Sequence, residues 1–117
     1  MEIEKLKVAG LTENESKIYL SLLEMGPRPA GTISRKTGLH RRVIYDATDR
    51  LIKKGLIGYI IENGKKVFSA SNQQRFLEIA KEKEKEITDV LPSLMEVFGS
   101  SKEKQREDIL FFRGKEG

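Results

Sequence analysis

The chain has 117 residues, of which 38% are hydrophobic and 34% charged, so it has room for one small core and an appendage but not for two full domains. Its net charge of +4 at pH 7 favours an acidic partner such as nucleic acid. The absence of cysteine and the single histidine exclude disulfides and ordinary zinc sites, and the charged N-terminus and short apolar runs predict neither a signal peptide nor a membrane span.

The first predicted helix starts at Thr12-Glu13-Asn14-Glu15. This is the pattern of a capping box, in which Thr12 and Glu15 satisfy backbone amides that the start of a helix leaves without partners. A core face follows at helical spacing, made of Ile18, Tyr19, Leu22 and Leu23. Gly26-Pro27 and Pro29 end this helix, because proline cannot continue it.

Two more helices are predicted next, from about Ala30 to Thr37 with Gly38 as a left-handed cap, and from about 40 to 54 before Gly55. The longer one has an apolar side and an opposite side rich in charge. A solvated charged face is also normal for a core helix of a bundle. Its place after a tight turn and before a hairpin favours a binding role.

The hairpin is predicted from two strands, 56–61 and 66–70, joined through Asn63-Gly64. This dipeptide suits a type I′ turn because both residues tolerate positive φ. A two-residue loop sets Glu62 opposite Lys65 as a favourable charge pair, which leaves Lys66 and Asn63 free to approach a ligand. A solvated hairpin tip without a ligand remains the alternative.

Positive charge is concentrated between residues 28 and 66. Ten basic and three acidic residues give this segment +7, so the rest of the +4 chain carries −3. A short helix, a turn, a basic helix and a basic hairpin in that order describe a winged helix-turn-helix. We therefore expect a fold that is mainly α with a small β-hairpin, with this domain at residues 1–72.

A long helix is predicted over residues 73–98, with Pro92 expected to kink or restart it. Its apolar stripe exceeds what the small core can cover, so we expect a dimerisation helix; folding back onto its own domain is the alternative. The expected dimer-interface residues are Phe76, Ile87, Leu91, Leu94 and Phe98.

Residues 99–117 are predicted to be a polar linker followed by a short apolar strand at 108–113. An isolated strand is not stable alone. The strand is therefore expected either to pair across a dimer or to be the stub of a missing effector domain.

Several segments in order resemble the TrmB-like family of winged-helix transcriptional regulators, found mainly in archaea. The resemblance covers about residues 8–80 and rests on the segments at 10–23, 33–38, 44–46 and 51–57. It implies sequence-specific binding of double-stranded DNA by a homodimer, with the helix at about 40–54 in the major groove and the hairpin at 59–68 as a wing on the backbone. Two departures are Thr48, where an apolar residue is usual, and a more basic helix start at Arg41-Arg42.

Longer members of that family carry a C-terminal sugar-binding domain. The sequence stops where that domain would begin, so no small-molecule effector is expected for this chain as it stands. We expect no enzyme activity, cofactor or metal, no membrane partner, and a cytoplasmic, nucleoid-associated location.

The resemblance and the charge pattern together suggest which residues touch DNA. Arg42 is the first candidate for reading bases, because a guanidinium can pair with guanine O6 and N7. The expected base contacts are Arg42, Arg41 and Tyr45. The expected phosphate contacts are Arg28, Thr32, Arg35, His40, Lys53 and Lys54, and the wing residues are Asn63, Lys65 and Lys66.

Two other functions fit the same pattern. One is a winged-helix module that binds a protein of the transcription machinery, which predicts weak, salt-labile and sequence-blind DNA binding. The other is an architectural protein that coats DNA without preferring any operator.

Overall fold

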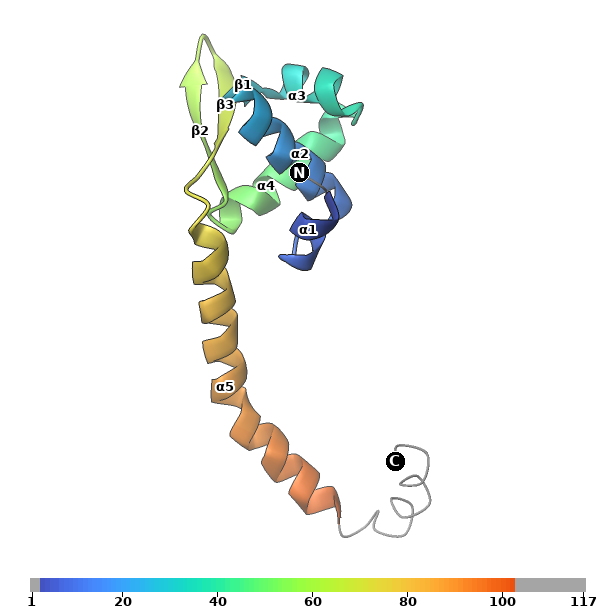
Figure 1. Ribbon diagram of the computed structural model, residues 1–117, viewed down its shortest axis with the longest axis vertical. Helices are drawn as coiled ribbons and strands as arrows, with labels where there is room; N and C mark the ends of the chain where they lie inside the picture. The colour runs from blue at the N-terminus through green and yellow to red at the C-terminus, as the bar shows by residue number, and fades with distance from the viewer. Residues whose placement is uncertain (1–2, 103–117) are drawn as a thin grey trace. The chain divides into compact units, whose positions relative to one another are not determined.

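The computed structural model describes residues 3–102, which form five helices and a three-stranded sheet (Figure 1). The helices are α1 (Ile3–Val8), α2 (Glu13–Met25), α3 (Ala30–Thr37), α4 (Arg41–Lys53) and α5 (Arg75–Lys102). The strands are β1 (Arg28–Pro29), β2 (Ile57–Glu62) and β3 (Lys65–Ala70). The predicted fold class, a winged helix-turn-helix followed by a long helix, is confirmed. The chain divides into two compact units, Met1–Ile79 and Ala80–Gly117.

Helix α2 begins with the predicted capping box. The Thr12 amide donates to Glu15 Oε1 at 2.9 Å, and the Glu15 amide donates to Thr12 Oγ1 at 3.1 Å. The helix ends at Gly26, and its inner face buries Ile18 and Leu22.

Helices α3 and α4 form the helix-turn-helix. Helix α3 ends at Gly38, which takes the left-handed conformation with φ of 77°. His40 caps α4, because its Nδ1 accepts a hydrogen bond from the Arg42 amide at 3.2 Å. The cap fixes where the basic helix begins, and the apolar side of the helix is buried through Ile44, Ala47 and Leu51.

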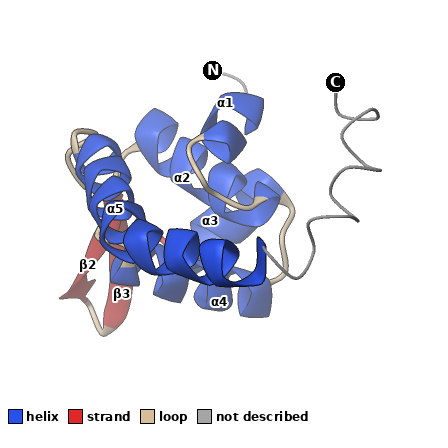
Figure 2. Ribbon diagram, turned by 90° about the horizontal axis from the view of Figure 1, so that it is seen from below, coloured by secondary structure: helices blue, strands red, loops and turns tan. Residues whose placement is uncertain are grey.

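The sheet is antiparallel with the order β1-β3-β2. Asn63 and Gly64 have φ of 52° and 76°, and the register sets Glu62 opposite Lys65, as predicted. In the two views the hairpin of β2 and β3 stands beside the helices α2, α3 and α4 (Figures 1 and 2). Ile57 and Phe68 anchor it in the core, while its distal part is exposed.

One hydrophobic core joins all these elements within residues 3–79. Each fully buried aliphatic or aromatic side chain contributes about 1.5–3 kcal/mol of transfer free energy. The buried apolar residues are Leu6, Leu11, Ile18, Tyr19, Leu22, Ala30, Ile33, Ile44, Ala47, Leu51, Leu56, Ile57 and Phe68.

The structure adds two elements that the sequence did not predict. Helix α1 has six residues and buries only Leu6, so it is too short to show a clear period. Strand β1 has two residues, Arg28 and Pro29, which pair with Phe68 and Val67 of β3. A two-residue segment beside prolines would be predicted to be a loop from its sequence. It is a strand here because it pairs with β3.

Helix α5 also differs from expectation. It runs through Pro92 without ending there and continues to Lys102, so residues 99–102 are helical where a linker was predicted. Phe76 packs within its own unit, with its ring centroid 5.3 Å from that of Tyr19 in an edge-to-face arrangement. Further along α5, Ile87, Leu91 and Leu94 are exposed. The predicted strand at 108–113 lies outside the described residues.

No helix within residues 3–102 combines the length and the apolar character needed to cross a membrane.

Candidate nucleic-acid interface

Three elements surround a groove of about 470 Å³: the first turns of α3, the start of α4 and the tip of the hairpin. Six of the predicted DNA-contacting residues line it, namely Thr32, Arg35, Arg41, Tyr45, Lys65 and Lys66. The other lining residues are Pro29, Ala30, Gly31 and Gly64. The structure therefore brings together cations from three parts of the sequence that lie up to 31 positions apart, since Arg35 and Lys66 share the groove.

Helix α4 presents two exposed rows of polar side chains. Arg41 and Tyr45, one turn apart, line the groove. Arg42 is exposed outside the groove lining and shares a row, by helical spacing, with Asp46, Asp49 and Lys53. The four residues of this outer row form no ion pair in the described part of the chain. The two carboxylates are therefore available to accept hydrogen bonds from outside the protein.

The hairpin contributes two cations with different surroundings. Lys66 Nζ lies 4.6 Å from the centroid of the Tyr59 ring, a cation–π contact that the sequence did not suggest. Lys65 stands opposite Glu62 in the strand register. The expected charge pair is not formed: among the ion pairs of residues 3–102, none joins Glu62 and Lys65. Lys65 therefore keeps its charge available at the rim of the groove.

Besides Arg42 and Lys54, four predicted contact residues lie outside the groove lining. Arg28 is on β1, where its Nη1 donates to the Pro27 carbonyl at 2.7 Å. His40 is engaged as the cap of α4, Lys53 is exposed in the last turn of α4, and Asn63 forms the hairpin turn. Their contacts with DNA remain predictions.

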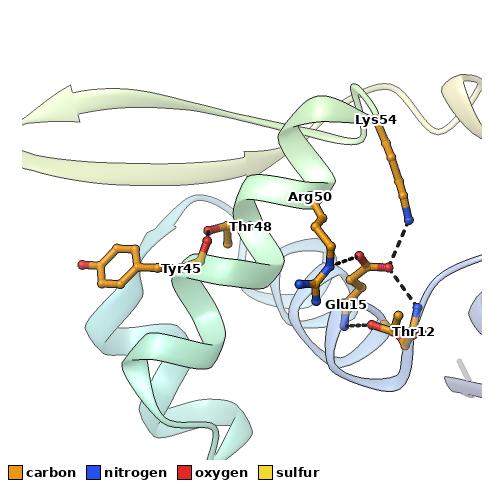
Figure 3. Close-up of polar contacts among 7 residues, drawn as sticks. Thr12, Glu15, Tyr45, Thr48, Arg50 and Lys54 are labelled. Carbon is orange, nitrogen blue, oxygen red and sulfur yellow. Dashed lines mark hydrogen bonds and ion pairs between the residues drawn. The ribbon is translucent and has the colours of Figure 1, made fainter.

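Lys54 has a partner inside the protein. Glu15 of α2 has a side chain only 1% exposed, and its carboxylate binds Arg50 Nε at 2.7 Å and Lys54 Nζ at 3.2 Å (Figure 3). The proposed role of Lys54 at a phosphate competes with this ion pair. Arg50 and Lys54 are instead the residues that tie the end of α4 to the start of α2.

The Glu15 carboxylate is ionised against the effect of its burial. Burial would raise the pKa of Glu15, but hydrogen bonds from the Thr12 amide, Arg50 and Lys54, with the charge of Lys54, outweigh it and lower the pKa below its usual value. Sequence reasoning found the capping role of Glu15 and missed this one. A glutamate at the third helical position is usually solvated, and its two partners follow 35 and 39 residues later.

Thr48 departs from the apolar residue expected in α4 and is nevertheless buried, with 2% exposure. Its hydroxyl donates to the Tyr45 carbonyl at 3.1 Å (Figure 3). This bond to the preceding turn satisfies the hydroxyl, so Thr48 can be buried without leaving its polar group unpaired.

No cluster of three or more histidine or acidic residues in the described part of the chain could hold a metal ion. The groove is instead lined by hydrogen-bond donors and positive charges, which suit a polyanion.

Comparison with known proteins shows that the chain is similar to transcriptional regulators. The family model described as "Sugar-specific transcriptional regulator TrmB" matches residues 6–74. The sugar-sensing transcriptional regulator TrmBL1 of Pyrococcus furiosus is 33% identical over 80 residues, which are 68% of this chain and 23% of that protein. The uncharacterised protein YrhO of Bacillus subtilis is 36% identical over 53 residues, 45% of this chain and 19% of that protein. The chain thus matches about a fifth to a quarter of the length of these relatives.

Solved structures resemble the fold. A probable transcriptional regulator from Pseudomonas aeruginosa aligns with a TM-score of 0.53 and 28% identity, covering 71% of this chain and 67% of the other. The ST1889 protein of Sulfolobus tokodaii gives a TM-score of 0.56 at 20% identity, covering 72% of this chain and 96% of the other. A MarR family protein from Bacillus stearothermophilus gives 0.55 at 19% identity, over 92% and 81% of the two chains. The last two show a shared fold.

Proposed function

The chain belongs to the TrmB family of sugar-specific transcriptional regulators, and we propose that it acts as a regulator that binds a specific sequence of double-stranded DNA. In this proposal α4 enters the major groove and the hairpin of β2 and β3 contacts the backbone as a wing. The observation that carries the proposal is the groove between α3, α4 and the hairpin tip, where Arg35, Arg41 and Lys65 have no acidic partners within the described chain.

The proposed contacts divide between base reading and anchoring. Arg42, Arg41 and Tyr45 at the start of α4 are the candidates for base edges. The candidates for phosphate are Thr32, Arg35, Lys65 and Lys66 around the groove, and Arg28, His40, Lys53 and Asn63 beside it. Lys54 is the least suited of the predicted set, since binding a phosphate would weaken its ion pair with Glu15.

We further propose that a second copy of the chain pairs along α5. Ile87, Leu91 and Leu94 recur at helical spacing and are 45–56% exposed, and two helices packed along such a stripe would cover it. A two-fold dimer presents two α4 helices to two half-sites and doubles the contact with one operator. Phe76 is left out of this stripe because it packs on Tyr19.

The test is a fluorescence-anisotropy titration of the protein against the DNA upstream of its own gene and against a scrambled duplex, across a salt series. We expect a preference of about a thousandfold or more for the upstream DNA at physiological salt. A protein with Lys65→Ala and Lys66→Ala should bind both duplexes more weakly and with a shallower dependence on salt. The matched control carries Lys81→Ala and Lys83→Ala in α5, which removes the same charge from residues that do not line the groove.

Other outcomes would support the other functions. Equal and tight binding to both duplexes would favour an architectural protein that coats DNA. Negligible binding to either would favour a module that docks on another protein, and the hairpin would then be the first surface to examine, because Ile60 and Ile61 of its edge strand are 61% and 63% exposed.

A further inference from the structure

Gly31 lies in the first turn of α3 and lines the groove. Its backbone does not require glycine, since it is helical and, unlike Gly38 at the end of the same helix, has no positive φ. Glycine is a poorer helix former than alanine. The backbone conformation therefore gives no reason for glycine at this position. The neighbouring side chains give one.

The space that a side chain would fill at Gly31 is occupied by Arg41. A Cβ atom at Gly31 would lie 2.7 Å from Nη2 and 3.6 Å from Cζ of Arg41. The same point is 3.8 Å from Nη1 of Arg35. Carbon and nitrogen atoms that are not bonded do not approach as closely as 2.7 Å, so the Arg41 guanidinium can hold this position only while residue 31 has no side chain.

The two guanidinium groups that meet at Gly31 have no acidic partner. Arg35 Nη2 donates to Thr32 Oγ1 at 3.2 Å, and no carboxylate between residues 3 and 102 forms an ion pair with Arg35 or Arg41. Lys65 and Lys66 line the same groove. Like charges held close together repel, and an anion between them removes that repulsion. A phosphate suits two planar guanidinium groups because its oxygens can accept several hydrogen bonds at once.

We propose that Gly31 is a positioning residue for DNA binding: because it has no side chain, Arg41 lies against the first turn of α3 beside Arg35, and the two arginines bind one phosphate of the DNA backbone. This inference rests on the proposed function and refines it. It assigns Arg41 to the backbone, where its sequence position had suggested base edges, and leaves base reading to Arg42 and Tyr45.

The test compares Gly31→Ala, Arg41→Ala and the double variant in the anisotropy assay, with the upstream and scrambled duplexes across the same salt series. Each single change should weaken binding to both duplexes by roughly fivefold, the value of about one net hydrogen bond, and reduce the salt slope by up to about one. The double variant should bind no more weakly than Arg41→Ala alone, because displacing the guanidinium and deleting it remove the same contact.

Two controls separate this effect from damage to the fold. Gly31→Ala should keep or raise the melting temperature, because the atoms it displaces are the end of a flexible side chain and alanine favours the helix. Gly99→Ala, a helical glycine of α5 whose added Cβ would meet nothing within 4 Å, should leave affinity and salt slope unchanged.

Unchanged affinity and salt slope in Gly31→Ala would overturn the inference, as would losses that add in the double variant. A loss confined to the upstream duplex in Arg41→Ala would show that Arg41 reads bases instead. If the unaltered protein binds neither duplex, both the proposed function and this inference are refuted. If the unaltered protein binds the upstream DNA but the variants do not show the expected losses, only this inference is refuted.

Discussion

At the scale of single residues, Glu15 shows how one side chain can serve two purposes. It completes the cap of α2 through the Thr12 amide and binds Arg50 and Lys54 at the end of α4. A buried carboxylate with fewer partners would be unstable as an anion, and the three donors here offset its desolvation. The result is a polar connection between α2 and the helix proposed to read DNA.

We expect Glu15→Gln to lower the free energy of unfolding at pH 7 by about 1–2 kcal/mol, since a neutral amide can still cap α2 but loses its charge-assisted bonds to Arg50 and Lys54. Denaturant unfolding monitored by circular dichroism measures this. Glu13→Gln, in the same turn but 61% exposed, should change stability far less. Equal effects of the two changes would contradict the role given to Glu15.

The same carboxylate predicts a dependence on pH. Because the pKa of Glu15 is lowered in the folded protein, its contribution is complete above the ordinary value of 4.5 and is lost as pH falls through the folded value. The stability difference between the unaltered protein and Glu15→Gln should therefore be constant near neutral pH and shrink below about pH 4.5. Unfolding curves collected from pH 7 to pH 3 would show it, and a constant difference throughout would argue against an ionised Glu15.

Arg42 and Lys53 share the outer row of α4 and should behave differently. If Arg42 pairs with a guanine, Arg42→Ala should cost about 1–3 kcal/mol of binding free energy, concentrated at one operator position. Lys53→Ala removes the same charge from the same row and should weaken all sequences alike. Titrations against a set of single-base operator variants distinguish the two patterns, and a uniform loss in Arg42→Ala would remove it from base reading.

Among the secondary-structure elements, α5 is the one whose proposed role, pairing with a second copy of the chain, is inferred from its exposed apolar residues. Its first turn packs on the core through Phe76, while its later residues expose an apolar row between runs of alternating charge. A row of this kind is stable in water when another surface covers it. A second α5 would present the same apolar row at the same helical period.

Leu94→Asp should therefore convert the expected dimer to monomer, because it sets two carboxylates at the centre of the proposed contact. Sedimentation velocity measures the change in mass. Ser93→Asp adds the same charge one position away, off the stripe, and should leave the dimer intact. A mass that is the same in both variants and in the unaltered protein would end the proposal for this surface.

At the scale of the whole molecule, the core lies within residues 1–79 and the proposed dimer surface beyond it. A chain ending at Ala80 keeps every buried apolar residue of the described part of the chain, including Phe68, and keeps Phe76 against Tyr19. We expect it to melt cooperatively within a few degrees of the full chain, to be monomeric, and to bind the operator more weakly. Calorimetry and sedimentation check this, and loss of cooperative melting would show that α5 beyond Ile79 supports the core.

Features that depend on near neighbours in the chain could be predicted without coordinates. The capping box at Thr12, the left-handed Gly38 and the Asn63-Gly64 turn are local, since each sets the backbone within four residues. The excess of positive charge between residues 28 and 66 was likewise visible without coordinates. Together these features were sufficient to predict a winged helix-turn-helix.

Features that depend on contacts between distant residues became visible in the folded chain. It paired Glu15 with Arg50 and Lys54, made a strand of Arg28 and Pro29 by setting them beside β3, and directed Phe76 to the core. It also brought Arg41 against Gly31. The physical reason is that each of these contacts depends on the packing of elements far apart in the chain, and such packing leaves no period or local motif in the sequence.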